Sequence, residues 1–370
     1  MSLDRPNTFE IDLSAVARAT ARVRAQIGPG VMFFATLKSD AYGYGVLPAA
    51  RTVLAHGADA LSLACVSDAI AMRAAGIDAP ILLYAGVLHD ADAVRAYETH
   101  GFMPTIHDEA SFQALCRHAS RRLDVAVKVD VGPERIGVPY SEAAGFVARV
   151  AAHPMLRLAV VNAHPNVRGG ERAAACLDWQ YERMVELARR LREAGIRGHR
   201  TVMASSKVLR MAGSRMAFDA VDPGAALFSE VDAAGGNAAQ AFHALKSRLI
   251  AVRTVERDAF LDEAPFAMRP GMRVGVLPIG YSDGVHRAHA GCALVRGRRV
   301  PIVGNAALEY LRLDLSEVPD AQPGDEAVLI GAQGGMAIAP QEAMRHQGAA
   351  RVIDMALQIG RGVKRIYLPA

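Results

Sequence analysis

Short apolar segments alternate with longer amphipathic segments through the first two-thirds of the chain. Several of the short ones, such as MFFATLK and LAVVNA, lack the alternation of a half-exposed strand, which is expected of strands buried on both faces. The pattern predicts eight such strands, over residues 32–38, 60–66, 80–86, 102–106, 123–130, 156–164, 200–205 and 218–222.

Segments with apolar residues at helical spacing fill the gaps between these strands. They cover residues 12–27, 67–75, 90–100, 141–153 and 176–194, and several end at a glycine, the usual residue just past a helix. Ser14 is a candidate N-cap for the first helix. Eight strands with intervening helices predict an α/β fold, a (β/α)8 TIM barrel over residues 1–240. A doubly wound sheet is the alternative, but no GxGxxG turn follows the first strand.

The pattern changes near residue 240. Beyond it Gly and Pro are frequent, helical spacing is sparse, and strands are predicted over residues 243–253, 273–278, 293–295, 299–303 and 326–330. We therefore expect a second, mostly β domain over residues 241–370.

Composition narrows the class of protein. Of the 370 residues 51% are hydrophobic, which is enough for a large core and excludes a disordered chain. A net charge of +4 does not indicate a nucleic-acid partner, and the longest apolar run is too short to span a membrane. The N-terminus lacks signal-peptide features, and the 4 cysteines form no CxxC pair, so reduced, mostly buried thiols are expected. These features predict a cytoplasmic protein, and no metal site is predicted.

Polar residues follow several of the predicted strands, where the active site of such a barrel lies. Lys38 ends the first strand, and an amine at such a partly dry position has a lowered pKa and can bind an aldehyde covalently. An ordinary lysine with a solvated ammonium is more common on spacing alone, but the DAYGYG that follows is unusual for a loop. Ser206 and Gly224 follow the seventh and eighth strands, a recurrent phosphate site, although helix capping would also explain them. Together the three residues indicate pyridoxal 5'-phosphate as the cofactor.

These motifs resemble those of the alanine racemase family, the barrel-type (fold III) pyridoxal-phosphate enzymes, and the resemblance covers nearly the whole chain. ATLKSDAYGYG is similar to the family's lysine motif, which implies that Lys38 binds the cofactor and that Tyr42 lies near its phosphate. VKVDVGPERIGV is similar to the segment whose lysine, here Lys128, is often carbamylated and whose arginine, here Arg135, lies near the cofactor and the substrate carboxylate. His164, in NAHPN, matches the histidine that supports the second base.

The remaining matches imply the phosphate contacts and the second base. Ser206, Gly224 and Ala225 match phosphate contacts of the family. PIGYSDG is similar to the GYxDG motif, which implies that Tyr281 is the second catalytic base and reaches the barrel of the other subunit. The resemblance therefore implies an amino-acid racemase that acts as a head-to-tail homodimer. In it, Lys38 and Tyr281 exchange the α-proton on opposite faces of the substrate.

Several positions depart from the family pattern. Asp222 stands where the family has an arginine facing the pyridine nitrogen, and a carboxylate favours a protonated ring, which is a stronger electron sink. The alternative is that the alignment slips by a few residues and Asp222 only caps a turn. The substrate loop carries Leu308 and Glu309 where the family commonly has Met and Asp, and Arg361 replaces a tyrosine on the phosphate. These changes leave room for an amino acid larger than alanine or charged.

Two other functions are compatible with the same cofactor. A barrel-type decarboxylase or lyase would suit an acidic partner of the ring nitrogen, but Tyr281 in GYSDG serves two-base exchange and the Cys-Asp loop of the decarboxylases is not found. A non-enzymatic pyridoxal-phosphate carrier is the third alternative, but such carriers are usually the barrel alone.

Overall fold

The computed structural model describes residues 4–132, 134–167, 170–231, 237–256, 268–287 and 291–370. Its internal contacts divide the chain into two units. The barrel unit comprises Val16–Ala41 and Val46–Ala239, and the C-terminal unit comprises Met1–Ala15, Tyr42–Gly45 and Gln240–Ala370.

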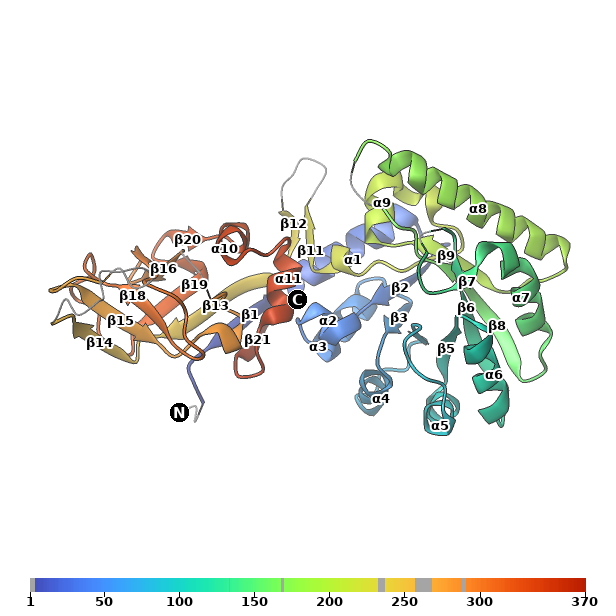
Figure 1. Ribbon diagram of the computed structural model, residues 1–370, viewed down its shortest axis with the longest axis horizontal. Coiled ribbons are helices and arrows are strands. Elements are labelled where there is room, and N and C mark those ends of the chain that lie inside the picture. Colours follow the sequence, from blue (N-terminus) through green and yellow to red (C-terminus); the bar gives the residue numbers. More distant parts are fainter. Residues whose placement is uncertain (1–3, 133, 168–169, 232–236, 257–267, 288–290) are drawn as a thin grey trace. The chain divides into compact units, whose positions relative to one another are not determined.

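Parallel strands form the centre of the barrel unit (Figure 1), and their pairing closes them into a ring. In the described residues the ring contains β2 (Met32–Thr36), β3 (Ala60–Leu63), β4 (Ile81–Leu83), β5 (Phe102–Ile106), β6 (Leu123–Asp130), β8 (Leu156–Ala163), β9 (Arg200–Ala204) and β10 (Ala220–Val221). They pair in the order β5-β4-β3-β2-β10-β9-β8-β6, and pairing of β5 with β6 closes the ring. The short β7 (Val138–Pro139) adds to β6, and β11 (Ser229–Val231) pairs with β12 (Asn237–Gln240). The predicted (β/α)8 barrel is confirmed.

Helices cover the outside of the ring, as Figure 1 shows for α4 to α8. The helices of this part of the chain are α1 (Leu13–Ile27), α2 (Lys38–Tyr42), α3 (Val46–Ala55), α4 (Val66–Ala74), α5 (Ala91–His100), α6 (Glu109–His118), α7 (Tyr140–Ala152), α8 (Ala173–Glu193) and α9 (Ser206–Ala212), with the 3-10 turns η1 (Gly213–Met216) and η2 (Ala225–Leu227). The sequence pattern predicts α1, α4, α5, α7 and α8 and misses the rest, of which α2, α6 and α9 begin within a few residues of a strand.

The start of α1 differs from the prediction. Asp12 rather than Ser14 caps the helix, because its Oδ1 accepts hydrogen bonds from the backbone N–H of Ala15 at 3.0 Å and from the Ser14 hydroxyl at 2.6 Å. Ser14 therefore supports the cap from inside the first turn, where its hydroxyl is a donor to the capping carboxylate.

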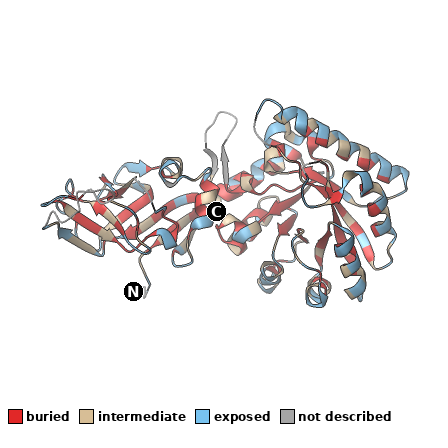
Figure 2. Ribbon diagram, viewed as in Figure 1, coloured by how far each residue is buried: buried red, intermediate tan, exposed pale blue. Residues whose placement is uncertain are grey.

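The barrel strands are buried along almost their whole length (Figure 2). All four residues of β3 are buried, as are the last four of β2. One cluster of the core combines Phe34, Leu82, Val160 and Val202 from four different strands. This two-sided burial is why these strands read as continuous apolar runs in the sequence.

The C-terminal unit is mostly β, as predicted. Its main sheet contains β1 (Thr8–Asp12), β13 (Phe242–Arg248), β16 (Cys292–Val295), β17 (Arg298–Pro301), β19 (Glu326–Gln333), β20 (Met336–Ile338) and β21 (Lys364–Leu368). The order is β17-β16-β19-β13-β1-β21, with β20 on β19, so the N-terminal strand β1 lies between β13 and β21. A second sheet has the order β14 (Ala251–Thr254), β15 (Arg273–Leu277) and β18 (Leu311–Asp314). Two helices, α10 (Pro340–Gln347) and α11 (Val352–Gln358), and the 3-10 turn η3 (Tyr281–Asp283) complete the described elements.

The strand expected over residues 243–253 is two strands in two different sheets. Leu249 donates its backbone N–H to Asp325, whereas the next residue, Ile250, donates to Val276 of β15. The chain therefore changes sheets between these two residues, and an unbroken apolar run cannot reveal such a change.

No helix in the described ranges is both long and apolar enough to cross a membrane. The cysteines are free thiols, but the expectation that they are mostly buried is wrong, because Cys65 and Cys176 are exposed and Cys116 and Cys292 are only partly buried. Cys65, for example, is the N-cap residue of α4, a position at a helix end rather than in the core.

Candidate functional site

A left-handed turn follows β2 at the carboxyl end of the barrel strands. Residues 39–41 of α2 have φ of 52°, and Tyr42 has φ of 59°. This conformation costs a residue with a Cβ roughly 1–2 kcal/mol, so backbone strain is concentrated directly after Lys38. The carboxylate of Asp40 supports the turn by accepting a hydrogen bond from the backbone N–H of Val46 at 2.7 Å.

The Lys38 amine lies against an aromatic ring. Its Nζ is 3.6 Å from the centroid of the Tyr84 ring, and Tyr84 follows β4 with only 8% of its surface exposed. Within the described ranges, Lys38 Nζ makes no hydrogen bond or ion pair. Burial lowers the pKa of Lys38, the Asp222 carboxylate opposes this shift, and Arg135 adds to it. The resulting access to the neutral amine is what attack on an aldehyde requires.

Asp222 follows β10 and has one oxygen bound and one free. Oδ2 accepts a hydrogen bond from the Tyr84 hydroxyl at 2.6 Å and a longer one from Asn162 Nδ2 at 3.4 Å. Oδ1 is buried and has no hydrogen-bond partner among the described residues. A buried acceptor left without a donor costs about 1–3 kcal/mol, so Oδ1 marks a place for a donor carried by a ligand.

Lys128 and His164 extend this polar group along the neighbouring strands. Lys128 of β6 donates a hydrogen bond to Oδ1 of Asn162 in β8. Burial lowers the pKa of Lys128 to about 7, which the Asp222 carboxylate opposes and the Lys38 ammonium reinforces. Burial also lowers the pKa of His164 to about 4. The imidazole is therefore neutral at neutral pH, and Lys128 is near its midpoint.

Ser206 and the backbone after Gly224 form a cluster of polar groups at the ends of β9 and β10. The Ser206 hydroxyl oxygen accepts hydrogen bonds from the backbone N–H groups of Gly224 at 2.9 Å and Ala226 at 3.1 Å. The capping alternative is therefore present in the structure. Ser206 still retains a hydroxyl proton, which is a donor of the kind that binds phosphate. Arg135 is exposed, and its backbone N–H donates to the carboxylate of Asp130 at 2.5 Å.

These groups fit pyridoxal phosphate. Lys38 offers an amine of lowered pKa for the aldehyde, Asp222 offers a buried and unpartnered oxygen for a ring N–H, and the Ser206 region offers donors for a phosphate. In the described part of the chain, no group of three or more His, Cys, Asp or Glu side chains could hold a metal ion.

The C-terminal unit holds Tyr281 on a short turn that a second loop supports. Tyr281 begins η3, is 42% exposed, and lies with its ring centroid 5.4 Å from the Arg287 guanidinium carbon. Its backbone N–H donates to the carbonyl of Ala307 at 3.0 Å, and the N–H of Ser282 donates to the carbonyl of Leu308 at 3.0 Å. The turn that carries Tyr281 is thus bound directly to the predicted substrate loop.

A buried carboxylate anchors the other end of this turn. Asp283 is 1% exposed and accepts hydrogen bonds from two guanidinium nitrogens of Arg5, both at 2.9 Å, and from the backbone N–H of Gly280 at 3.0 Å. Arg5 also lies 3.7 Å from the carboxylate of Glu309. Leu308, Glu309 and Arg361 are exposed.

The structure brings together part of the predicted site. Lys38, Lys128 and Asp222 all lie around Tyr84, which the sequence analysis missed together with Asn162. The sequence offered no clear signal for Tyr84, because the strand predicted over residues 80–86 contains it, whereas in the structure β4 ends at Leu83. His164 and Arg135 are close enough to act electrostatically on this group. The roles of the predicted residues outside it stay predictions: Tyr42, Arg135, His164, Ser206, Gly224, Ala225, Tyr281, Leu308, Glu309 and Arg361.

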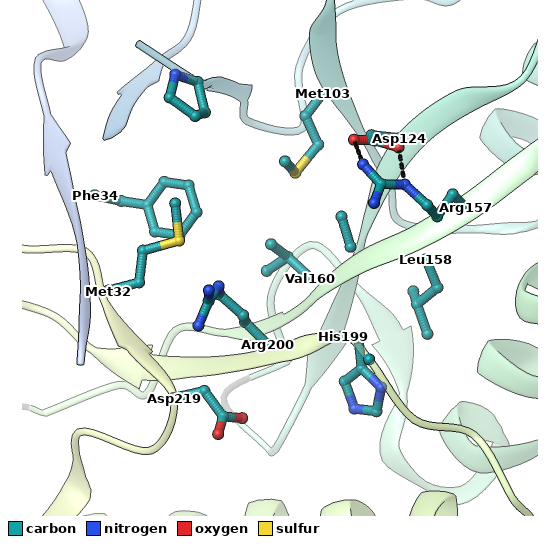
Figure 3. A pocket seen from close by; sticks show the side chains of 13 residues that line it. Met32, Phe34, Met103, Asp124, Arg157, Leu158, Val160, His199, Arg200 and Asp219 are labelled. Atoms are coloured by element: carbon teal, nitrogen blue, oxygen red, sulfur yellow. Dashed lines mark hydrogen bonds and ion pairs between the residues drawn. The ribbon is translucent and has the colours of Figure 1, made fainter. Parts of the chain in front are cut away.

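A cavity of about 500 Å³ opens at the opposite end of the barrel, where the strands begin (Figure 3). Met32, Met103 and Val160 line it, and at its rim Arg157 forms an ion pair with Asp124. In barrels of this type that end contributes to stability, and catalytic groups lie at the other end. The cavity therefore does not compete with the Lys38 site.

Comparison with known proteins gives a consistent result over the whole chain. Residues 11–231 match the family model for the alanine racemase N-terminal domain, and residues 242–367 match that for the alanine racemase C-terminal domain. The chain is 31% identical to an alanine racemase of Desulfovibrio desulfuricans, with 100% of each chain covered, and 30% identical to one of Synechocystis sp., with 88% of this chain and 89% of the other covered. Its fold is similar to the crystal structure of alanine racemase from Bacillus anthracis with bound L-Ala-P, with a TM-score of 0.86, 26% identity, and 100% and 96% of the two chains covered.

Proposed function

The chain belongs to the alanine racemase family and is a pyridoxal-phosphate-dependent racemase, and from this premise we propose that Lys38 and Tyr281 exchange the α-proton of a small amino acid on its two faces. The observation that carries the proposal is the partly buried Lys38 amine, whose pKa is lowered and which lies against the ring of Tyr84, the residue whose hydroxyl binds the Asp222 carboxylate.

Lys38 has two tasks in this proposal. It binds the aldehyde of the cofactor, and once released from it the amine takes or returns a proton at the α-carbon. When bound, pyridoxal phosphate supplies an electron sink for the negative charge that proton removal leaves on the substrate. Because burial lowers the pKa of Lys38, the amine can exist in the neutral form that accepts a proton.

Other groups of the barrel unit would hold the cofactor. Asp222 Oδ1 would accept the ring N–H, and Ser206 with the backbone N–H groups of Gly224 and Ala225 would bind the phosphate. Asn162 joins Lys128 to Asp222, so it helps to keep the carboxylate in place.

Tyr281 is the proposed second base. Its exposed side chain stands on a turn whose backbone is fixed by the carbonyls of Ala307 and Leu308, so the phenol is presented on a rigid support. We propose that a homodimer pairs each barrel with the C-terminal unit of the partner subunit, as the resemblance to the family implies. Arg135, Leu308 and Glu309 would then contact the substrate.

The substrate class is an amino acid, and we propose alanine as the first to test. L-Ala-P is bound in the Bacillus anthracis relative, which supports a small side chain. Glu309 and Arg361 are exposed charged groups in the C-terminal unit, and they support testing larger or charged amino acids as well.

The test uses single-enantiomer amino acids in deuterated water with the purified holoenzyme. Racemisation with deuterium uptake at the α-carbon supports the proposal, whereas release of carbon dioxide or elimination products would replace it with a decarboxylase or lyase. No reaction with cofactor bound would indicate a carrier. Lys38→Ala and Tyr281→Phe should each abolish racemisation, while Tyr140→Phe, which changes a phenol at the start of α7, should leave it unchanged.

A further inference from the structure

Tyr84 is the residue that connects the Lys38 amine to the Asp222 carboxylate. The face of its ring lies 3.6 Å from Lys38 Nζ, and its hydroxyl donates to Asp222 Oδ2 at 2.6 Å. Lys128 Nζ lies further from the same ring, at 5.9 Å from the centroid. One side chain thus touches both groups that the proposed function assigns to the cofactor's two ends, the aldehyde and the ring nitrogen.

The direction of the hydrogen bond between Tyr84 and Asp222 is fixed by the chemistry of the two groups. Thr36 donates its hydroxyl proton to the backbone carbonyl of Asp222 at 2.9 Å. An ionised carboxylate can only accept, so the Tyr84 hydroxyl donates its proton to Asp222 Oδ2, and its oxygen also lies 3.2 Å from Thr36 Oγ1. Burial and the neighbouring Asp222 charge raise the pKa of Tyr84 well above its usual value, so the phenol stays protonated and keeps the proton that it donates to the carboxylate. A hydrogen bond of this length to a carboxylate is charge-assisted and holds the carboxylate in one orientation.

Fixing Oδ2 has a consequence for the other oxygen. Tyr84 and Asn162 both donate to Oδ2, and Oδ1 is buried with no partner among the residues that the structure describes. If the carboxylate could rotate freely, its two oxygens would share these donors in turn. With Oδ2 held, Oδ1 is the one acceptor of this carboxylate that remains open to a ligand.

We infer that Tyr84 is a positioning residue that sets both ends of the cofactor site: its hydroxyl fixes the Asp222 carboxylate so that Oδ1 receives the ring N–H of the cofactor, and its ring holds the Lys38 amine. The inference rests on the proposed function, because it needs pyridoxal phosphate at Lys38. It assigns separate tasks to two parts of one side chain, and substitution can separate them.

Tyr84→Phe keeps the ring and removes the hydroxyl, and Tyr84→Leu removes both. Tyr97→Phe is the matched control, because Tyr97 is also a buried tyrosine of the barrel unit, with its hydroxyl 3.1 Å from His89 Nδ1 and no contact with Asp222. The first measurement is the 15N chemical shift of pyridine-15N-labelled cofactor in the holoenzyme, with Asp222→Asn providing the value for an unprotonated ring nitrogen.

Tyr84→Phe should move this shift from the protonated value of the unmodified enzyme toward the Asp222→Asn value. Without the phenol the Asp222 anion is less stable, so the carboxyl group retains the shared proton. The affinity of the full-length cofactor-free chain for pyridoxal phosphate should fall about tenfold, the typical effect of one lost charge-assisted hydrogen bond. Tyr97→Phe should change neither quantity.

The second measurement is the titration of Lys38 in the full-length cofactor-free chain, followed by NMR of labelled lysine side chains. Tyr84→Leu should lower the pKa of Lys38 by about one pH unit, because the aromatic face that stabilises the ammonium is lost, and Tyr84→Phe should leave it nearly unchanged. Equal effects of the Phe and Leu variants on Lys38, or an unchanged ring-nitrogen shift in Tyr84→Phe, would overturn the inference.

Failure of the proposed function would give a different result from failure of the inference about Tyr84. Borohydride reduction followed by peptide mass analysis shows whether the cofactor is bound covalently to Lys38 in the unmodified holoenzyme. Absence of that bond would remove the proposed function and the inference with it. A bond at Lys38 combined with an unprotonated ring nitrogen in the unmodified enzyme would leave the function standing and overturn the role of Tyr84.

Discussion

A single added methyl group at Gly280 should separate binding of the cofactor from turnover. Gly280 has φ of −149°, an extended conformation that alanine adopts without strain, so only the added atom matters. A Cβ at this position would lie 2.5 Å from the carbonyl oxygen of Leu308, and it would overlap the carbonyl oxygen of Ala307 even more. Both carbonyls accept the hydrogen bonds that hold the Tyr281 turn.

The size of the effect follows from these distances. Real Cβ atoms stay at least 3.0 Å from such atoms, so the two loops must move apart by half an ångström at Leu308 and by more at Ala307. Overpacking of this kind costs about 1–3 kcal/mol of stability. A displacement approaching 1 Å in a catalytic group can lower turnover by roughly 100-fold. We expect Gly280→Ala to lose activity on that scale while the barrel unit still binds the cofactor.

The assay combines kcat/KM for racemisation, the visible absorbance of the bound cofactor and a urea unfolding curve. Gly145→Ala in α7 is the matched control, because a Cβ there meets no atom within 4 Å. It should keep full activity and gain about 0.5–1 kcal/mol of stability, as alanine does in a helix interior. Full activity in Gly280→Ala would refute the reasoning that the two loops position Tyr281, and loss of cofactor absorbance would show that the effect is not local.

Three further predictions concern buried charges. Asp222→Asn should lower the pKa of Lys38 further in the cofactor-free chain, because the Asp222 charge opposes the effect of burial. Side-chain NMR titration measures the pKa of Lys38, and a raised value would contradict the prediction. The pKa of Lys128 is about 7 in the folded state and near the ordinary value of 10.5 in the unfolded state. Between these two pH values the unfolded state binds more protons, so the free energy of unfolding should rise with pH over that range. Lys128→Met should flatten this rise, of up to about 1.4 kcal/mol per pH unit, in urea denaturation across that window, and an equally steep rise in the variant would assign it to other groups. Arg5→Ala leaves the carboxylate of Asp283 buried without its ion pair and should cost about 2 kcal/mol in the same assay; an unchanged unfolding midpoint would show that the pair contributes nothing.

The barrel was predictable because its strands are buried on both faces. Each reads as a compact apolar run, and β5 and β6 have the predicted bounds at both ends. The N-terminal strand β1 was not predictable in the same way. Its sequence, TFEID, alternates apolar and polar residues, and its partners β13 and β21 follow the whole barrel in the sequence. Local pattern cannot show that a segment joins a sheet formed by residues so distant.

The candidate site was predictable where a residue carries its own chemistry. Lys38 stands out because an amine at the end of an apolar strand is unusual in itself. Tyr84 does not, because a tyrosine after a strand is ordinary, and its importance comes from the carboxylate of Asp222, 138 residues away in the sequence. Asn162 was missed for the same reason, since its two contacts, with Lys128 and Asp222, come from different strands.

The position of β1 between β13 and β21 has a consequence for biosynthesis. The ribosome synthesises Thr8–Asp12 before the barrel strands and Lys364–Leu368 after them. The backbone donors and acceptors of β1 therefore stay unpaired until the whole barrel has been synthesised, because the partner strands β13 and β21 follow the barrel in the sequence. If the protein were expressed as two fragments divided near residue 240, the C-terminal fragment would lack the internal strand β1. Adding a separate peptide of residues 1–12 should restore that strand.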